Sequence, residues 1–469
     1  MKRLPIVMLC LLAFCPAVRA ATSVSQYGIT WTFDRDYAVG RFCTGDYWVV
    51  GPIRITRIST DLHAAGFIPG PGQDGSMVNP TGGEKQGYDS RLNCNGVSCY
   101  DAALNAALPN GKPISPDNPL VLAPNSSLVS MVSWLCKSPA EKEPGTPAFA
   151  GYSKAPRSMT RSGAILTVLA AAPPEGSFRP PYCGSDKTVK FNVSQLDRSL
   201  LRNLDPPAST PDPVELAKHM RRPWIDHVHE WLGADVHPTE NMPNYGREIA
   251  ATIGTIAVVL HLDFSKLPGK PSKDKLLVEF IQFGIDCAGV ADNGGGWPNN
   301  GGHGQGRKLP ILFAGLMLND AHMKQVGTWK TRFQEDEQTF YVSQADVELT
   351  HSKRWRPDTR QNTPTPYETK DIGLAEWACA CVGPPPALCA NANWDVPYRA
   401  MNSANDPGLV LAARIMGQQQ AWNHKALFDY ADRWMKHFHG VHGYSRTPKF
   451  IVDLWTSAST NATAPLRQP

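Results

Sequence analysis

Two kinds of hydrophobic pattern divide the chain. From residue 23 to about residue 203, short runs rich in β-branched and aromatic residues alternate with Gly, Pro, Asn and Asp, which predicts strands. The runs are Ile29–Phe33, Tyr47–Val50, Ile53–Arg57, Ser127–Met131 and Ala164–Val168. Short strands separated by turn residues are typical of a sandwich. We therefore expect a β-sandwich-like domain over residues 21–204.

The pattern becomes helical after a proline-rich stretch. Residues 205–213 contain a density of proline that neither a helix nor a central strand tolerates, so they are expected to form a linker. Beyond it, apolar residues recur three and four positions apart, which predicts helices. The helical segments are Val214–Met220, Arg247–Leu262, Lys273–Ala288, Arg307–Leu318, Leu409–Met416 and Trp422–Phe438. Because long Gly-rich or Pro-rich loops join them, we expect an (α/α) toroid as the catalytic domain over residues 214–469.

The first twenty residues are typical of a signal peptide. A Lys-Arg pair precedes the apolar run Leu4–Val18, and small residues stand where cleavage after Ala20 requires them. This run is shorter than the roughly 20 residues needed to span a bilayer. The next long apolar stretch, Ile249–Leu262, is broken by Thr and Gly and is expected to be a buried helix. We therefore expect a secreted or periplasmic protein with no membrane span after cleavage.

The charge pattern argues against a nucleic-acid partner. The chain has 46 Lys and Arg against 42 Asp and Glu, and removing three basic residues with the signal peptide leaves 43 against 42, or +1. No basic run with interleaved aromatic residues remains, so no nucleic-acid partner is expected. We expect a monomer.

Cysteine content points to an oxidising compartment. Two of the 11 cysteines lie in the signal peptide, which leaves nine, so at least one thiol is expected to stay free. Short bridges are predicted where Cys94 and Cys99 bracket a turn and where Cys379, Cys381 and Cys389 flank a Pro-rich loop. A zinc site is the alternative, but the chain has no CxxC pair. The other mature cysteines are Cys43, Cys136, Cys183 and Cys287.

A glycine-rich segment over residues 294–308 is the most informative part of the helical half. Its mixture of glycines and hydrogen-bonding side chains before a predicted helix is expected where a backbone passes close to a ligand. It lacks both the phosphate-loop spacing and the βαβ context of a dinucleotide fingerprint. The alternative is a flexible surface loop. The candidate ligand contacts are Trp297, Asn299, Asn300, His303, Gln305 and Arg307.

Two further clusters lie on either side of this segment. Residues 244–248, Asn-Tyr-Gly-Arg-Glu, open a predicted helix, where Asn244 is also a natural N-cap. Residues 366–377 supply a phenol and three carboxylates, each of which has a solvated or capping role as its simplest interpretation. The residues of these clusters are Asn244, Tyr245, Arg247 and Glu248, then Tyr367, Glu368, Asp371 and Glu376, followed by Trp394, Tyr398, Arg399 and Asn402.

Histidines also gather in two places without a strong metal signature. His437, His439 and His442 point in different directions from an amphipathic helix, so surface or core positions are favoured for them and for His227 and His229. No HExxH, GxSxG or SxxK motif occurs, which argues against zinc proteases, α/β-hydrolases and β-lactamases. We expect no cofactor and leave a structural calcium ion open.

The helical half resembles secreted bacterial (α/α)-toroid polysaccharide lyases, in particular the glucuronan and alginate lyases of family 38. The resemblance rests on residues 244–248, on Gly-Gly-His-Gly-Gln-Gly-Arg-Lys at 301–308, on Tyr-Glu-Thr-Lys-Asp-Ile-Gly-Leu-Ala-Glu-Trp at 367–377, and on Ala-Trp-Asn-His at 421–424 with Phe-Asp-Tyr at 428–430. It covers about half the chain. The resemblance implies β-elimination from an acidic, uronate-containing polysaccharide.

The resemblance also implies roles for individual residues. In such a lyase, Asn, His or Arg groups stabilise the charge that develops on the uronate carboxylate, a Tyr or His takes the C5 proton, and a Tyr protonates the departing O4. Asn300 and Arg307 would neutralise the carboxylate, with His303 as base or orienting group. Tyr367 would donate the proton and is also a candidate base, with Tyr398 and Tyr444 as alternatives. The substrate contacts would be Asn244, Tyr245, Arg247, Trp297, Asn299, Gln305, Glu368 and Arg399.

Two other functions remain open. A glycoside hydrolase on the same toroid would pair Glu368 or Asp371 with Glu376 or Asp292 as acid and base. A non-catalytic glycan-binding or surface protein would instead stack sugar rings on exposed tryptophans. The candidates for stacking are Trp31, Trp48, Trp297 and Trp394.

Overall fold

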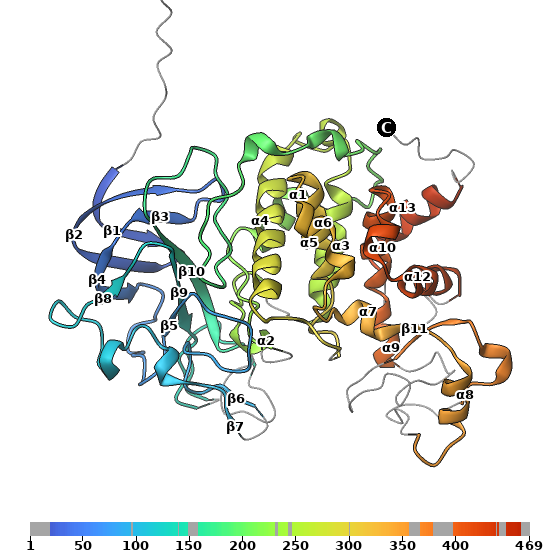
Figure 1. The fold of residues 1–469 in the computed structure, drawn as a ribbon, viewed down its shortest axis with the longest axis horizontal. Coiled ribbons are helices and arrows are strands. Elements are labelled where there is room, and N and C mark those ends of the chain that lie inside the picture. Colours follow the sequence, from blue (N-terminus) through green and yellow to red (C-terminus); the bar gives the residue numbers. More distant parts are fainter. Residues whose placement is uncertain are drawn as a thin grey trace, which may run out of the picture.

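The structure is a computed structural model in which a strand-rich N-terminal half adjoins a helical C-terminal half (Figure 1). It describes residues 19–94, 97–138, 140–148, 158–229, 233–242, 246–299, 301–355, 366–378, 397–437, 439 and 447–460. One curled sheet contains eight strands: β1 Arg19–Gln26, β2 Ile29–Arg41, β3 Tyr47–Val50, β4 Ile53–Thr60, β5 Ser76–Val78, β8 Leu120–Leu122, β9 Ser126–Ser133 and β10 Thr160–Leu169. Two small pairs are β6 Asn93–Cys94 with β7 Val97–Ser98, and β11 Thr339–Tyr341 with β12 Ala375–Trp377.

The large sheet combines antiparallel strand pairs with one parallel pair. The order is β5-β9-β10-β3-β2-β4-β8, and β1 pairs with β2. The pairing of β10 with β3 is parallel, whereas the other pairings in this sheet are antiparallel. β2 is 13 residues long and bonds to β1 along its length, to β4 near its start and to β3 near its end. All five predicted strand runs are confirmed, because each lies inside one of these strands.

The predicted β-sandwich-like fold is wrong. β9 and β10 are buried on both faces, and the second face is covered by helices rather than by a second sheet. Leu128 and Leu166 pack inside the curl, whereas Val129 and Ile165 join the core of the helical half. The runs of β-branched residues predicted the strands correctly but carried no information about their partners, which are set by long-range pairing.

Thirteen α-helices are described between residues 213 and 460. The six predicted helical segments are confirmed, with ends shifted by a few residues. The helices are α1 Pro213–Met220, α2 Gly233–Val236, α3 Arg247–Val259, α4 Lys273–Asp292, α5 Lys308–Met317, α6 Ala321–Lys324, α7 Gln334–Gln338, α8 Gln344–Thr350, α9 Pro397–Ser403, α10 Asp406–Ile415, α11 Gln419–Trp422, α12 Lys425–His437 and α13 Lys449–Thr460.

The predicted (α/α) toroid is also wrong, since the described helices form no such ring (Figure 1). The helices α2, α6, α7 and α11 have only four or five residues each, too short to form the paired walls of a toroid. Of the longer helices, α5 packs on both α3 and α4, and all three share a core with the sheet. Helical periodicity identified the apolar faces of these helices but did not reveal that one of the surfaces they cover is β-sheet.

A single apolar core crosses the predicted domain boundary. It contains Val129 and Ile165 from the sheet together with Ile253 of α3, Phe280 of α4 and Phe313 of α5. Residues 205–213 run along the surface of this unit, where Leu204 bridges to Leu262 and Asp212 caps α1. The division into domains at 21–204, 205–213 and 214–469 stays a prediction.

Export and disulfide bonding also stay predictions. Residues 1–18 lie outside the described residues, and Arg19 and Ala20 pair with β2 as the start of β1. In the part of the chain that the structure describes, no helix is long and apolar enough to cross a membrane. Free thiols occur at Cys43, Cys136, Cys183 and Cys287. The side chain of Cys94, and Cys379, Cys381 and Cys389, lie outside the described residues.

Candidate functional site

The short helix α7 holds the first half of the glycine-rich segment. The Asn299 backbone N–H donates to Glu337 Oε2 at 2.8 Å, and the Gly304 N–H donates to Gln334 Oε1 at 2.7 Å. Gln338 Nε2 donates to Asn299 Oδ1 at 3.1 Å. Asn299 is buried, so its side chain supports the loop from inside rather than facing solvent.

Two buried carboxyl groups hold the second half of the segment. Gln305 Nε2 donates to Asp406 Oδ1 at 2.7 Å, while Glu335 accepts the backbone N–H groups of Gly306 at 3.2 Å and Lys308 at 3.3 Å. Burial raises the pKa of Glu335 to about 7 and that of Asp406 well above its ordinary value. Gln305 therefore belongs to the interior of the protein.

Arg307 and Trp297 converge on one buried aspartate. Arg307 forms a two-pronged ion pair with Asp226, through Nε at 2.8 Å and Nη2 at 3.1 Å, and all of its side chain is buried. Trp297 Nε1 donates to the same carboxylate at 2.9 Å, and its ring stacks on Phe333. Two side chains predicted to contact substrate thus form part of the core that supports the loop.

His303 has a different environment, because it lies at the start of α3. A Cβ on Gly246 would stand 3.7 Å from His303 Nδ1, and Gly246 has φ 147°, a region that favours glycine. Arg247 and Glu248 follow in the first turn of α3, with side chains 40% and 41% exposed and Arg247 Nε 3.4 Å from Glu248 Oε1. Solvent therefore reaches this end of the loop.

Helix α9 closes the other side of this location. A Cβ on Gly302 would stand 2.3 Å from Asn402 Oδ1 and 2.8 Å from Arg247 Cβ, so only glycine permits this approach of loop, α3 and α9. Arg247 Nη1 also donates to the sulfur of Met401, at 3.0 Å. We call this location the Arg247–His303 site; it consists of Gly246, Arg247, Glu248, Gly302, His303 and Asn402.

One turn earlier on α9, Arg399 joins a buried network with Tyr367 and Glu376. Arg399 Nη2 lies 2.9 Å from Glu376 Oε2, the Tyr367 hydroxyl donates to the same oxygen at 3.1 Å, and Arg433 pairs with the other oxygen. Tyr367 is 1% exposed, and burial raises its pKa well above the ordinary value for a phenol. This network fixes α9 and therefore the position of Asn402.

Other predicted candidates lie apart from this site or outside the described residues. Glu368 is 3.6 Å from His351, and its backbone N–H donates to Asp371 at 2.8 Å, so the two acids form a capped turn. Asp292 pairs with His322 at 2.8 Å. Asn244, Tyr245, Asn300, Trp394, His442, Tyr444 and the side chain of Tyr398 lie outside the described residues.

The predicted histidine clusters form no metal centre in the described residues, where no three His, Cys, Asp or Glu side chains converge to hold an ion. His227 is buried between the rings of Tyr88 and Tyr182, and burial lowers its pKa to about 3. It is therefore a neutral core histidine. The candidates His229, His437 and His439 belong to no such group either.

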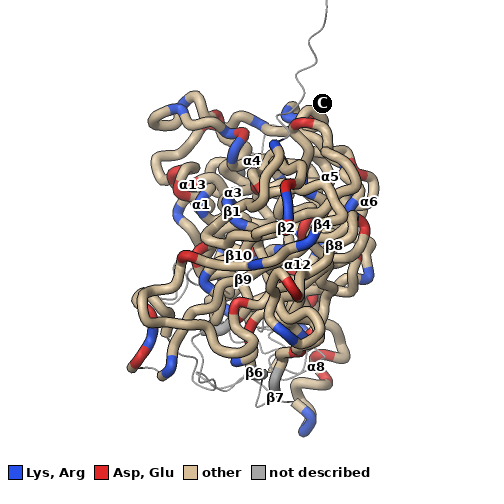
Figure 2. The backbone as a smooth tube through the Cα atoms, turned by 90° about the vertical axis from the view of Figure 1, so that its left-hand side faces the viewer, with Lys and Arg blue, Asp and Glu red and all other residues tan. Residues whose placement is uncertain are grey.

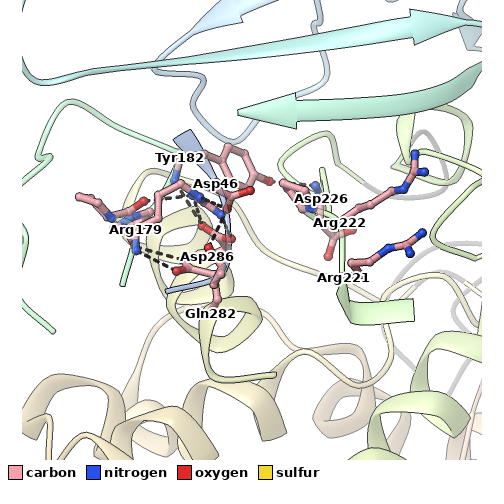
Figure 3. Close-up of polar contacts among 12 residues, drawn as sticks. Asp46, Arg179, Tyr182, Arg221, Arg222, Asp226, Gln282 and Asp286 are labelled. Carbon is pink, nitrogen blue, oxygen red and sulfur yellow. Dashed lines mark hydrogen bonds and ion pairs between the residues drawn. The ribbon is translucent and has the colours of Figure 1, made fainter. Parts of the chain in front are cut away.

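A buried charge network that was not predicted from the sequence joins the two halves (Figure 3). Arg179 donates to Asp286 through Nη1 at 2.9 Å and Nη2 at 2.5 Å, and through Nε to Asp46 at 2.8 Å. Gln282 Nε2 donates to the Arg179 carbonyl at 3.0 Å. No sequence motif links these positions, because they come from the β2–β3 loop, an irregular segment and α4.

The described residues line two hollows of different sizes. A cavity of about 20 Å³ beside the Arg179 network is lined partly by Glu279 and Trp224, and it has room for about one water molecule. A groove of about 500 Å³ runs along β5, the loop over residues 79–85 and residues 103–106. None of the predicted site residues lines the groove.

Charge is distributed without a long single-sign track. Figure 2 shows basic and acidic residues interspersed over the side of the molecule that it displays. Anion recognition would therefore depend on local groups such as Arg247. Comparisons with protein-family models, with curated proteins and with solved structures found no match for this chain. The resemblance to family 38 lyases stays a prediction.

Proposed function

We propose that the protein is a polysaccharide lyase that cleaves a uronate-containing polymer by β-elimination at the Arg247–His303 site. The observation that carries the proposal is the approach of an imidazole, His303, to the solvent-exposed first turn of α3 beside Arg247. A guanidinium and the positive end of a 13-residue helix both favour a bound carboxylate. An imidazole is the usual side chain for proton transfer near neutral pH.

The proposed reaction uses these groups as follows. Arg247 stabilises the charge that develops on the uronate carboxylate as C5 loses its proton, and His303 accepts that proton through Nε2, since its Nδ1 is buried. Electrons of the broken C5–H bond form the C4–C5 double bond, the C4–O4 bond breaks, and the His303 imidazolium that has just formed gives its proton to the departing O4. Asn300 stays the proposed second carboxylate contact, next to Gly301 in the same loop.

Tyr367 has a supporting role in this proposal. Its hydroxyl donates to Glu376 and is removed from solvent, so it holds α9 through the Glu376–Arg399 network instead of meeting the substrate. Arg307 likewise acts through Asp226 on the shape of the loop. The proton that leaves with O4 is therefore assigned to the His303 imidazolium rather than to Tyr367.

Specific contacts argue against the two other functions. A hydrolase needs two carboxyl groups facing one glycosidic bond. Glu376 is instead bound by two arginines, and Asp292 and Asp371 have separate partners. A glycan-binding surface needs exposed aromatic rings, but Trp31, Trp48 and Trp297 are 0%, 3% and 5% exposed.

A polyuronate assay tests the proposal. Purified protein lacking residues 1–20 is mixed with glucuronan, alginate or pectate, and the ultraviolet absorbance of unsaturated uronate is followed with time. We expect a rise that falls about 10²- to 10⁴-fold in His303→Ala. Arg247→Gln is expected to lose about 10²- to 10³-fold.

The matched control is Arg198→Gln, which removes a half-exposed arginine that pairs with Asp274 at the start of α4. It should keep the wild-type rate, with all variants compared after their folding has been verified by circular dichroism. Absence of an absorbance rise on every polymer contradicts the proposal. New reducing ends without unsaturated product would instead indicate a hydrolase.

A further inference from the structure

Two buried acceptor atoms lie among the contacts that hold the glycine-rich segment. Asp406 Oδ2 and Gln305 Oε1 are both buried, and neither has a hydrogen-bond partner in the part of the chain that the structure describes. The two side chains are already joined, because Gln305 Nε2 donates to Asp406 Oδ1 at 2.7 Å. Leaving two buried acceptors unsatisfied is costly because each has lost its hydrogen bonds to water, so one shared donor would remove both penalties.

A proton on the carboxyl group would satisfy both acceptors. A carboxylic acid and a primary amide can form a ring with two hydrogen bonds, N–H to the carbonyl oxygen and O–H to the amide oxygen. We propose that Asp406 is a protonated acid whose Oδ2–H donates to Gln305 Oε1, and that this ring positions the loop that carries His303. Exchanging the N and O atoms of the Gln305 amide keeps the same ring and the same need for a proton.

The surroundings of Asp406 favour the neutral form. It is 1% exposed, and the ionisable group that faces it from α7 is another buried carboxyl, Glu335. Tyr430 faces it from α12, and its hydroxyl is bonded to Ser403 at 2.7 Å. The start of α10 favours a negative charge, but the helix dipole is weaker than the cost of burying an ion without a cation. Protonation therefore prevails.

The ring is connected to the Arg247–His303 site through two residues of backbone. Gln305 follows His303 by two positions, and Gly304 between them is held by Gln334 at 2.7 Å. Loss of the ring would therefore release the segment that brings His303 to Gly246. This positioning role rests on the proposed function, whereas the protonation of Asp406 does not.

Infrared spectroscopy tests the proton directly. Wild type and Asp406→Asn are compared at pH 7.5 in the C=O stretching region of protonated carboxyl groups, with Asp side chains labelled with ¹³C. We expect one labelled acid band in wild type that is absent from Asp406→Asn and retained in the control Glu335→Gln. Identical wild-type and Asp406→Asn spectra would overturn the proposal.

Two substitutions separate positioning from bulk stability. An asparagine can reproduce the ring, with Nδ2–H donating to Gln305 Oε1, so Asp406→Asn should retain kcat/KM within about threefold of wild type. Asp406→Leu cannot form it and should lose at least tenfold in kcat at unchanged pH optimum. If wild type shows no elimination activity, the proposed function fails while the infrared result still decides the protonation. Equal kcat for the Asn and Leu variants of an active enzyme contradicts the positioning role.

Discussion

The Arg179 network and the Arg247–His303 site use similar residues in opposite ways. Arg179 is fully buried, and its guanidinium is shared between Asp46 and Asp286 (Figure 3). Arg247 is 40% exposed, and the Glu248 carboxylate lies 3.4 Å from its Nε. The first arginine joins the sheet to α4, and the second stands where a ligand can reach it. Burial and the completeness of the partner set distinguish the two environments.

Arg307 shows why this distinction matters. The family resemblance implied that it neutralises the substrate carboxylate, but Arg307 is already paired with Asp226 inside the core. A guanidinium with a complete set of buried partners is expected to stabilise the fold, because removing either partner leaves an uncompensated charge. A partly exposed guanidinium contributes little to stability and is available for binding.

The largest expected effect comes from removing the buried arginine. Arg179→Met leaves Asp46 and Asp286 without their cation and should lower the free energy of unfolding by about 3 to 5 kcal/mol. Arg247→Met, at the exposed site, should change it by less than about 1 kcal/mol. Urea unfolding of both variants measures the difference. Equal decreases in the free energy of unfolding would contradict the distinction between a structural and an accessible arginine.

A smaller effect is expected from Glu279, which lines the cavity beside the Arg179 network. Burial raises the pKa of Glu279 to about 7, so the folded protein retains a proton that the unfolded chain releases above about pH 4. The contribution of Glu279 to the free energy of unfolding is therefore largest below about pH 4, and it is lost as the pH rises to about 7. Glu279→Gln removes that loss and should be about 2 to 3 kcal/mol more stable than wild type at pH 8.

Unfolding curves from pH 4.5 to pH 8 provide the measurement, and the gap between Glu279→Gln and wild type should widen through this range. Lys275 and Arg221 act against the pKa shift, and Asp46 acts with it. A gap that is constant with pH would mean that Glu279 is ionised in the folded protein and that the cavity is effectively open to water.

The smallest effect concerns the support that the sheet half provides to the glycine-rich segment. A Cβ on Gly82 would stand 2.2 Å from Gly295 N, whereas a Cβ on Gly83 would meet nothing within 4 Å. Gly82→Ala should therefore destabilise the protein by about 1 to 3 kcal/mol, and Gly83→Ala should stay within about 0.5 kcal/mol. Thermal unfolding of the adjacent pair compares them directly. Similar unfolding temperatures for the two variants would indicate that the contact between Gly82 and Gly295 has room for a methyl group.

The elements were largely predictable, whereas the architecture was not. The runs that form β3 and α4 were identified because local periodicity reflects which side chains are buried. The parallel pairing of β10 with β3 joins segments more than one hundred residues apart, and nothing in either run specifies it. Sandwich and toroid were inferred from typical connections, and the actual connections differ.

The candidate site was predictable in part for the same reason. Composition drew attention to residues 294–308 and to the start of α3, and the structure brings His303 and Arg247 together there. Asn402, Glu335 and Asp406 were not foreseen as partners of the loop, since each lies on a separate helix. Short hydrogen-bonding side chains on helices have no sequence pattern that marks their contacts.

By itself, the sequence determined the strand and helix segments, the apolar faces that drive their burial, and the glycines that permit close backbone approach at residues 302 and 246. Tertiary structure decided which face each element covers and which charged side chains are satisfied. These depend on partners far away in the chain, as Arg307 depends on Asp226, 81 residues earlier. Electrostatic and hydrogen-bonding energies change with burial and distance, and both are defined only once the chain has folded.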